Sequence, residues 1–422
     1  MDKTQVFKFT KKDFQWVIAL FGTAVGAGVL FLPIRAGMSG FFSVIVMSII
    51  IFPTIWLGHR ALGYFVLSSK SAGSDITEAM KDHLGNKFGR FVSVLYFFFL
   101  WPVCMAYGVG LTNTVASFII NQLGMNISMT HLGFRSIIAF SLITLVVFIL
   151  VRGRETVLKV TNALVYPLIA VLLLFSFYLI PSWNAQSVGV MPSWEDFLAN
   201  LWLTLPVLVF AFNHSPAISP MVQDLNTEDA NRDIIQKKVN SIELQTTNIL
   251  VLFIMFFVVS CVLSLTPEQL QEARMENIPI LSYFANKTGS AFIGFIGPLV
   301  AFAAIGSSFF THLLGCVEAL RGSVIDRVTN KTPQQIRKIN AYIIFALYIS
   351  MILMSILNPN ILDFMESLGG PIIALIIFVM PIYAFYTVPA LEKYRKNVLA
   401  NIWVLVMGLL TVSSVIFKLF RG

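Results

Sequence analysis

The stretch Phe21–Pro33 reads FGTAVGAGVLFLP and lies inside the first membrane-length apolar segment of the chain. A second interruption, FAFNHSPAISP at Phe210–Pro220, falls inside the sixth such segment. Because glycine tolerates many backbone conformations and proline lacks a backbone donor, we expect both segments to unwind within the bilayer. Unwound backbone at that depth persists only where it is buried in protein or lines a cavity. Paired interruptions of this kind predict the substrate site of a membrane transporter.

The composition is that of an all-α integral membrane protein, with 57% of the 422 residues hydrophobic and only 12% charged. A membrane-spanning helix needs about 20 predominantly apolar residues. Eleven segments meet this requirement and are numbered here as spans one to eleven: 15–34, 41–64, 91–121, 136–151, 157–180, 198–222, 244–265, 291–317, 341–357, 362–386 and 398–419.

The distribution of basic residues predicts the orientation. If the N-terminus is cytoplasmic, all but six of the 29 lysines and arginines fall on the cytoplasmic side, as the positive-inside rule requires. With eleven spans the C-terminus is then external, and the expected location is a membrane that the chain crosses many times. The net charge of +8 reflects this topology and anionic lipid, and no basic folded domain points to a nucleic-acid partner. The six external residues are Arg35, Arg135, Arg274, Lys287, Lys418 and Arg421.

Spans one to five and six to ten form two sets of five, and each set begins with a broken span. Because five is odd, the second set must enter the membrane from the opposite face, which predicts an inverted repeat. The predicted parts are a cytoplasmic segment, a transporter core of two repeats, and a peripheral eleventh helix with an external C-terminus. Their ranges are 1–14, 15–386 (repeats 15–180 and 198–386) and 387–422. The pattern does not specify an oligomeric state.

The glycine-rich break could serve two purposes. Gly22 and Gly26 form a small-xxx-small pattern, which also occurs where membrane helices simply pack closely. The freed amides of Ala27 and Gly28 would begin the second half-helix, and amides at a helix N-terminus suit a carboxylate. Pro33 downstream and the second break in span six favour the binding interpretation.

In span six, Asn213, His214 and Ser215 stand together before Pro216. A lone histidine on an apolar helix is more often a core residue than a functional one. Three consecutive polar residues at mid-span are nevertheless candidates for function, because polar groups at that depth are costly. They would suit a substrate with a short polar side chain such as a hydroxyl group.

These motifs carry a resemblance to a known family. GTAVGAGVLFLP, the FNHSP break, TNT at Thr112–Thr114 and LGGPIIA from Leu368 resemble the bacterial serine/threonine permeases of the hydroxy and aromatic amino acid permease family. That family belongs to the amino acid–polyamine–organocation superfamily, which has the leucine-transporter fold. The resemblance runs from about Asp13 to span eleven. It implies cation-coupled symport of L-serine, and also L-threonine, by alternating access across a bacterial inner membrane. An aromatic amino acid permease of the same family is the alternative.

The resemblance also implies roles for single residues. The substrate carboxylate would bind the amides of Ala27 and Gly28 beside Gly26, within reach of the Tyr107 hydroxyl. The ammonium group would bind carbonyl oxygens near Thr23, Phe210 and Asn213. Ala304, Ser307 and Ser308 resemble a sodium site that the carbonyls of Gly22 and Val25 would complete, since hard cations take oxygen ligands. Serine in a membrane helix also bonds to its own preceding turn, so this site and simple packing are both open.

The coupling ion is therefore left as sodium or proton. The resemblance implies proton coupling and a lysine near position 307, where this chain has Ser307. Proton coupling needs a titratable group within the membrane, and the candidates are His214, His312 and Glu318. No cofactor is expected.

A gate is predicted at the external end of span one. Arg35 follows Pro33, and Asp363 and Glu366 begin span ten on the same side. An arginine–carboxylate pair there would close the external pathway, although Arg35 could instead extend to the membrane interface.

Other classes of protein fit less well. The chain has no HExxH, P-loop or G-x-S-x-G motif, and its five histidines are scattered, so the sequence predicts no enzyme. A channel would show repeated selectivity-filter loops, whereas here one chain carries two dissimilar breaks. A channel or structural membrane protein is the remaining alternative.

Overall fold

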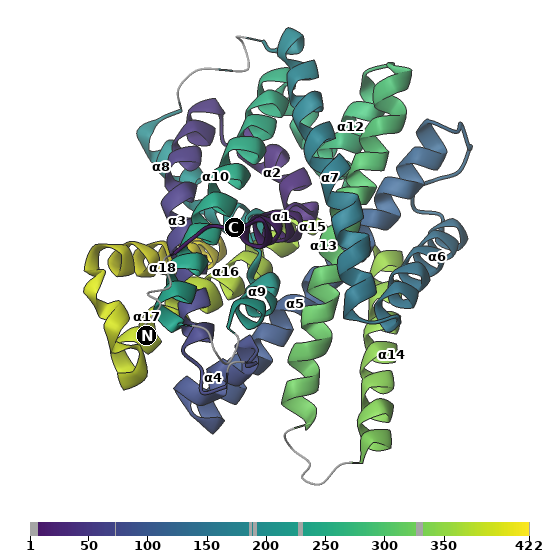
Figure 1. Ribbon diagram of the computed structural model, residues 1–422. Coiled ribbons are helices and arrows are strands. Elements are labelled where there is room, and N and C mark those ends of the chain that lie inside the picture. The colour runs from purple at the N-terminus through teal and green to yellow at the C-terminus, as the bar shows by residue number, and fades with distance from the viewer. Residues whose placement is uncertain are drawn as a thin grey trace.

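The computed structural model describes residues 7–71, 73–184, 188, 192–226, 231–325 and 332–421. Every regular element within these ranges is a helix (Figure 1). Ten helical segments are long and apolar enough to cross a membrane, and the bent pair α1 and α2 makes an eleventh. The predicted all-α membrane fold with eleven spans is thus confirmed. Residues 1–6 and 422 of the predicted terminal segments lie outside the described ranges.

The helices follow the predicted spans in order, with three short helices in the connections. Spans one to five are α1 Lys11–Ala24 with α2 Ala27–Met38, α3 Phe41–Leu67, α5 Asn86–Asn121, α6 Leu132–Val151 and α7 Arg154–Leu179. Spans six to eight are α8 Trp194–Ala211 with α9 Ile218–Leu225, α10 Arg232–Ser264 and α13 Ala291–Ile325. Spans nine to eleven are α14 Pro333–Leu357, then α15 Ile361–Phe364 with α16 Gly370–Ala374 and α17 Met380–Thr387, and α18 Val398–Arg421. The connecting helices are α4 Ile76–Leu84, α11 Pro267–Glu276 and α12 Ile280–Lys287.

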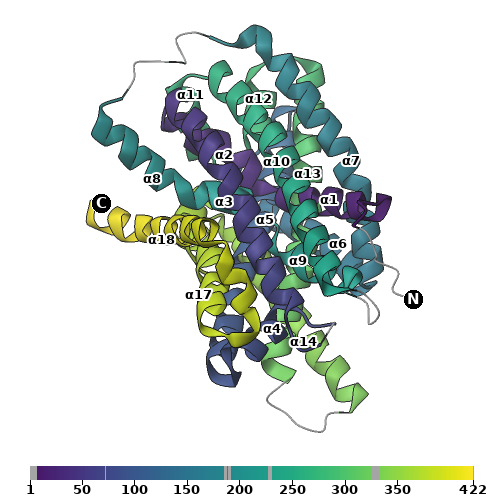
Figure 2. The same cartoon turned by 60° about the vertical axis from the view of Figure 1, so that its left-hand side comes forward.

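Both predicted breaks are present. In span one the helix stops at Ala24, resumes at Ala27, and bends by 58° between the two halves (Figure 2). In span six, α8 ends at Ala211 and a 3₁₀ turn over Ser215–Ala217 leads into α9. Pro216 supports this second break because it cannot donate the hydrogen bond that would continue an α-helix.

Span ten is an irregular helix. It contains two π-helical turns, Met365–Gly369 and Leu375–Val379. Gly369 ends the first of them and Gly370 follows it. A Cβ added to Gly369 would stand 2.8 Å from the Phe210 ring, and one added to Gly370 would clash with the Pro206 carbonyl oxygen. Close approach to span six therefore accompanies the irregular turn, and such turns are frequent at functional sites.

A buried arginine joins several helices on the face opposite the start of α1. Arg135 is 2% exposed, and it donates to the carbonyls of Ser355 and Ile356 and, at 2.9 Å, to Asn113 Oδ1. Asn113, the centre of the TNT motif, donates in turn to the Asn277 carbonyl at 2.7 Å. These bonds tie α5, α6 and the end of α14 to the segment after α11.

Span eleven lies at one side of the bundle (Figure 2), where α18 packs against α8 and α3. Two indole N–H groups hold it there: Trp202 donates to the Leu410 carbonyl at 2.7 Å, and Trp403 donates to Thr54 Oγ1 at 3.1 Å. The division of spans one to ten into two repeats stays a prediction.

Candidate functional site

The two breaks touch each other directly. A Cβ added to Gly28 would lie 2.7 Å from the Cα atom of Ala211 and 2.9 Å from the Phe210 ring. A side chain at position 28 would therefore force the two spans apart. Glycine at this position lets the freed amides of span one lie against the end of α8.

Two side chains from other helices converge on the span-one break. A Cβ added to Gly26 would lie 2.5 Å from Ser308 Oγ, on α13, and 3.4 Å from the Tyr107 hydroxyl oxygen, on α5. Both side chains are almost fully buried. Tyr107 thus has its hydroxyl at the unwound backbone rather than at a membrane interface.

Asn213 of span six faces the same region. Its Oδ1 accepts the Ser215 N–H at 3.0 Å, and its Nδ2 lies 3.4 Å from His312 Nε2. The other ring nitrogen of His312 faces the Ser308 carbonyl at 2.9 Å, so it must carry a proton and leave Nε2 as the acceptor. The His312 ring also packs edge-on against Tyr107. Asn213, His312, Tyr107 and Ser308 form one buried polar group around the breaks.

Phe210 covers this group toward span ten. Its ring lies edge-on to Phe364, with centroids 6.1 Å apart, and also contacts Phe99 on α5. Its carbonyl oxygen accepts the Asn213 N–H at 3.2 Å. The aromatic side chain and the carbonyl of one residue therefore bound the site on two sides.

His214 points away from that group. Its ring stacks on the His59 ring of α3, with the ring centroids 3.7 Å apart, and its Nε2 lies 2.9 Å from Glu243 Oε2 on α10. All three side chains are completely buried. Sequence reasoning missed His59 and Glu243, although ionisable residues inside spans are a usable signal. Glu243 was overlooked because the predicted span seven began one residue after it, whereas α10 begins at Arg232.

The residues predicted to hold sodium are buried but differ in their bonds. Ser308 Oγ donates to the carbonyls of Thr23, at 2.8 Å, and Gly22, at 3.4 Å. Ser307 Oγ instead donates to the Ala304 carbonyl of its own helix at 3.0 Å. Val25 is also buried at the break. Ser308 therefore links α13 to span one, while the Ser307 bond stays within α13.

Charged residues meet where spans one and ten approach α11. Arg35 Nε lies 3.3 Å from Glu366 Oε1, and both side chains are about nine-tenths buried. Arg274, on α11, contacts the same oxygen at 3.6 Å and binds Asp363 at 2.8 Å. Asp363 thus pairs with Arg274 and not with Arg35. Arg274 was not predicted as part of this cluster, because its approach depends on how α11 folds over the bundle.

On the face where α1 begins, a narrow pocket reaches the span-one break. It lies between α1, α7, α13 and the second half of span six, and its lining includes Thr23, Asn162, Pro216 and Glu318. The half-helix α1 beside it is held by ion pairs: Asp13 binds Lys238 at 2.9 Å and Lys12 binds Asp224 at 2.8 Å. The pocket approaches the site from the face opposite the Arg35–Glu366 pair.

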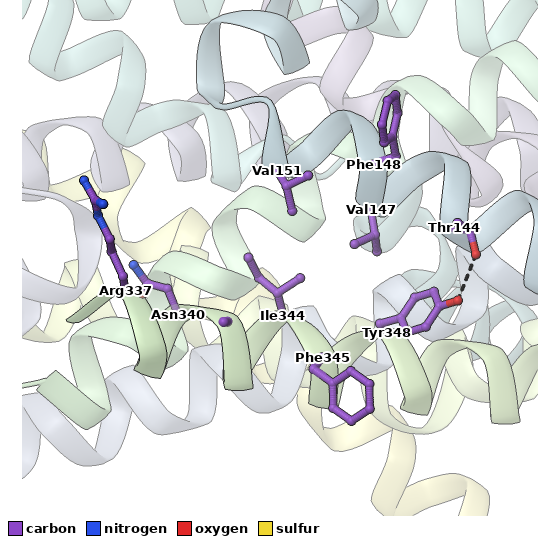
Figure 3. A pocket seen from close by; sticks show the side chains of 10 residues that line it. Thr144, Val147, Phe148, Val151, Arg337, Asn340, Ile344, Phe345 and Tyr348 are labelled. Atoms are coloured by element: carbon purple, nitrogen blue, oxygen red, sulfur yellow. Dashed lines mark hydrogen bonds between the residues drawn. The ribbon is translucent and has the colours of Figure 1, made fainter. Parts of the chain in front are cut away.

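A separate groove lies between α6 and α14 (Figure 3) and takes no residue from either break. It is lined mainly by apolar side chains such as Val147 and Ile344, with one hydrogen bond of 2.8 Å between Thr144 and Tyr348. Several neighbouring side chains are exposed and apolar, as expected of a surface that faces lipid. We therefore assign this groove to the lipid interface.

Comparison with known proteins places these features in a family. The tryptophan/tyrosine permease family matches residues 10–419. The serine transporter SdaC of Escherichia coli strain K12 is 40% identical over 417 residues, which cover 97% of this chain and 95% of the transporter. The serine transporter SdaC of Shigella flexneri matches at the same identity and coverage.

Proposed function

The chain belongs to the tryptophan/tyrosine permease family, and on that premise we propose that it is a cation-coupled symporter that imports L-serine, and also L-threonine, across a bacterial inner membrane. The relatives named above are serine transporters. The observation that carries the proposal is the meeting of the two breaks at Gly28 and Ala211, with Tyr107, Ser308 and Asn213 around them. This arrangement supports transport rather than catalysis, and it calls for no cofactor.

The substrate position follows from the groups available. We assign the carboxylate to the amides of Ala27 and Gly28, with the Tyr107 hydroxyl beside Gly26. The ammonium group is assigned to the carbonyl oxygens of Thr23, Phe210 and Asn213. Asn213 and Ser215 remain for the substrate hydroxyl, whereas His214 is turned toward His59 and Glu243.

The conformation fits one stage of alternating access. With the N-terminus cytoplasmic, the Arg35–Glu366–Arg274 cluster closes the external side, and the pocket at Thr23 lies on the cytoplasmic side. Breaking the ion pairs of Lys12 and Asp13 would free α1 to widen that pocket. We propose that these two sets of ion pairs open in turn.

Serine is expected to compete for labelled serine uptake far better than alanine or valine. A site built to bind a hydroxyl rejects substrates without it, because buried partners are left unpaired. Such a loss costs about 1–3 kcal/mol, or about 5- to 150-fold in affinity. The measurement is competition by a panel of amino acids in proteoliposomes. Equal inhibition by tryptophan or tyrosine would instead support an aromatic substrate, which is what the family description names.

Ser308→Ala is expected to reduce uptake more than Ser307→Ala. Ser308 bonds across to span one, whereas Ser307 bonds within its own helix. A membrane side-chain hydrogen bond contributes about 0.6–2 kcal/mol, which corresponds to about 3- to 30-fold. Serine uptake is measured at fixed pH while the external sodium concentration is varied. It is then measured without sodium while the proton gradient is varied. A rise in the half-saturating sodium concentration would support a sodium site at Gly22, Val25, Ala304, Ser307 and Ser308. Equal effects of the two variants would refute the distinction.

A further inference from the structure

A buried cluster of two histidines and one glutamate lies behind the span-six break. His59, His214 and Glu243 come from α3, the break and α10, and none is exposed. His59 Nδ1 faces the Ile55 carbonyl at 3.1 Å, and its Nε2 accepts the His214 backbone N–H at 3.3 Å. Because a carbonyl only accepts, the His59 proton is on Nδ1 and the ring is neutral in this arrangement.

The same reasoning counts the protons on His214 and Glu243. His214 Nδ1 faces the Phe212 carbonyl at 3.1 Å, so Nδ1 carries a proton. The 2.9 Å contact between His214 Nε2 and Glu243 Oε2 then needs a second proton, on either the nitrogen or the oxygen. Either form of the pair is neutral overall. Without this second proton, an acceptor nitrogen would face a carboxylate oxygen, and the buried charge would be uncompensated.

Other polar groups near the cluster do not replace that proton. His312 reaches it only through Asn213, and its Nδ1 is occupied by the Ser308 carbonyl. The Arg60 guanidinium, next to His59 in sequence, binds Asn240 Oδ1 at 3.2 Å and lies over the Trp56 ring. Among the described residues, no three histidine, cysteine, aspartate or glutamate side chains are arranged to hold a metal ion.

We propose that His214 and Glu243 together bind the coupling proton, with His59 as a positioning residue; this rests on the proposed symport. The proton comes from water on the external side, binds between Nε2 and Oε2, and is released to water on the cytoplasmic side. One positive charge then crosses with each zwitterionic substrate. Release of the proton leaves two acceptors, His214 Nε2 and the Glu243 carboxylate, facing each other. The break must therefore rearrange around His214.

The adjacent residue connects this site to the substrate. Asn213 and His214 are consecutive, and they point to opposite sides of the break, toward His312 and toward Glu243. A rearrangement that moves His214 therefore moves Asn213 and the Phe210 carbonyl to which its N–H is bonded. Loading of the proton and loading of the substrate are coupled through one short unwound segment.

The test uses the full-length protein in proteoliposomes with Glu243→Gln. A glutamine amide can donate to His214 Nε2 and so imitates the protonated pair, but it cannot release a proton. The variant is expected to lose serine accumulation driven by a proton gradient while retaining exchange of labelled for unlabelled serine. Its serine affinity should not change with pH. Wild-type affinity should tighten by up to about tenfold for each unit of pH lowered, because proton and serine binding are linked.

Two further variants make the result specific. Glu243→Asp keeps a titratable group and is expected to retain part of the proton-driven serine accumulation that Glu243→Gln loses. Glu155→Gln removes an exposed carboxylate that, within the described part of the chain, pairs with Lys159 on the surface, and it should behave as wild type. Loss of accumulation in Glu155→Gln as well would overturn the assignment.

Other outcomes are equally decisive. Proton-driven accumulation by Glu243→Gln, or wild-type serine affinity that does not change with pH, would refute the proton site. The measurement of wild-type serine affinity against pH tests the proposal even if Glu243→Gln does not fold. Accumulation by the wild type on a sodium gradient alone would also refute it, while leaving serine transport intact. If the wild type shows neither exchange nor accumulation of serine, the proposed function itself is refuted.

Discussion

Gly26→Ala is expected to abolish serine uptake while the protein still folds and inserts. The added Cβ would lie 2.5 Å from Oγ and 2.6 Å from Cβ of Ser308. Ser308 cannot easily yield, because its hydroxyl is bonded to the Thr23 carbonyl. Overpacking of this kind costs about 1–3 kcal/mol, and here the displacement falls on the amides assigned to the substrate. Initial uptake rates and the serine-induced rise in melting temperature are the measurements.

Two companion variants test the cause. Gly306→Ala is the matched control on α13, since among the described residues its Cβ would meet only Leu164 Cδ1, at 3.8 Å, an ordinary contact. The double variant Gly26→Ala, Ser308→Gly removes the clashing atoms and should recover part of the substrate binding. Wild-type uptake in Gly26→Ala would show that the close approach is not needed for transport.

Glu366→Gln is expected to slow transport strongly, with the main effect on turnover. The carboxylate is shared by Arg35 and Arg274, and Arg35 is largely buried. Removing one partner of a buried ion pair costs about 3–5 kcal/mol, because the remaining charge loses its counterion. The closed state of the external side should lose most of its stability. The measurement is the maximal uptake rate, together with labelling of an introduced external cysteine.

Asp363→Asn is the matched comparison. Asp363 is more than half exposed and binds only Arg274 among the pairs described above, so its loss should cost about 0–1 kcal/mol. The charge exchange Arg35→Glu, Glu366→Arg should restore little, since the new arginine would face Arg274. Equal turnover in Glu366→Gln and wild type would exclude a gating role.

The breaks were predictable from sequence because they have local causes. Glycine, proline and consecutive polar residues alter the backbone wherever they occur in an apolar segment. The same applies to the span boundaries, which follow from segment length. The approach of Arg35 to Glu366 could also be expected, since both lie at the same predicted end of their spans. The roles of the substrate, ion and gate residues stay predictions.

What the sequence did not indicate depends on contacts between distant segments. Glu243 is 29 residues from His214, and its position beside the break follows from the packing of α10 against α3. Arg274 joins the gate only because α11 folds over the bundle. The orientation of His214 away from Asn213 depends on backbone angles in the break, since adjacent polar residues can face the same or opposite sides.

The buried Arg135 has a mechanical consequence. Its guanidinium donates to carbonyls in the last turn of α14, which have no partner within their own helix, and Asn113 extends the bonding to the segment after α11. Spans three, four and nine are thereby fastened at one face by bonds that solvent cannot easily replace. α1, by contrast, is fastened by partly solvated ion pairs to Asp224 and Lys238. We expect the fastened spans to act as a stationary frame, against which the two broken helices move.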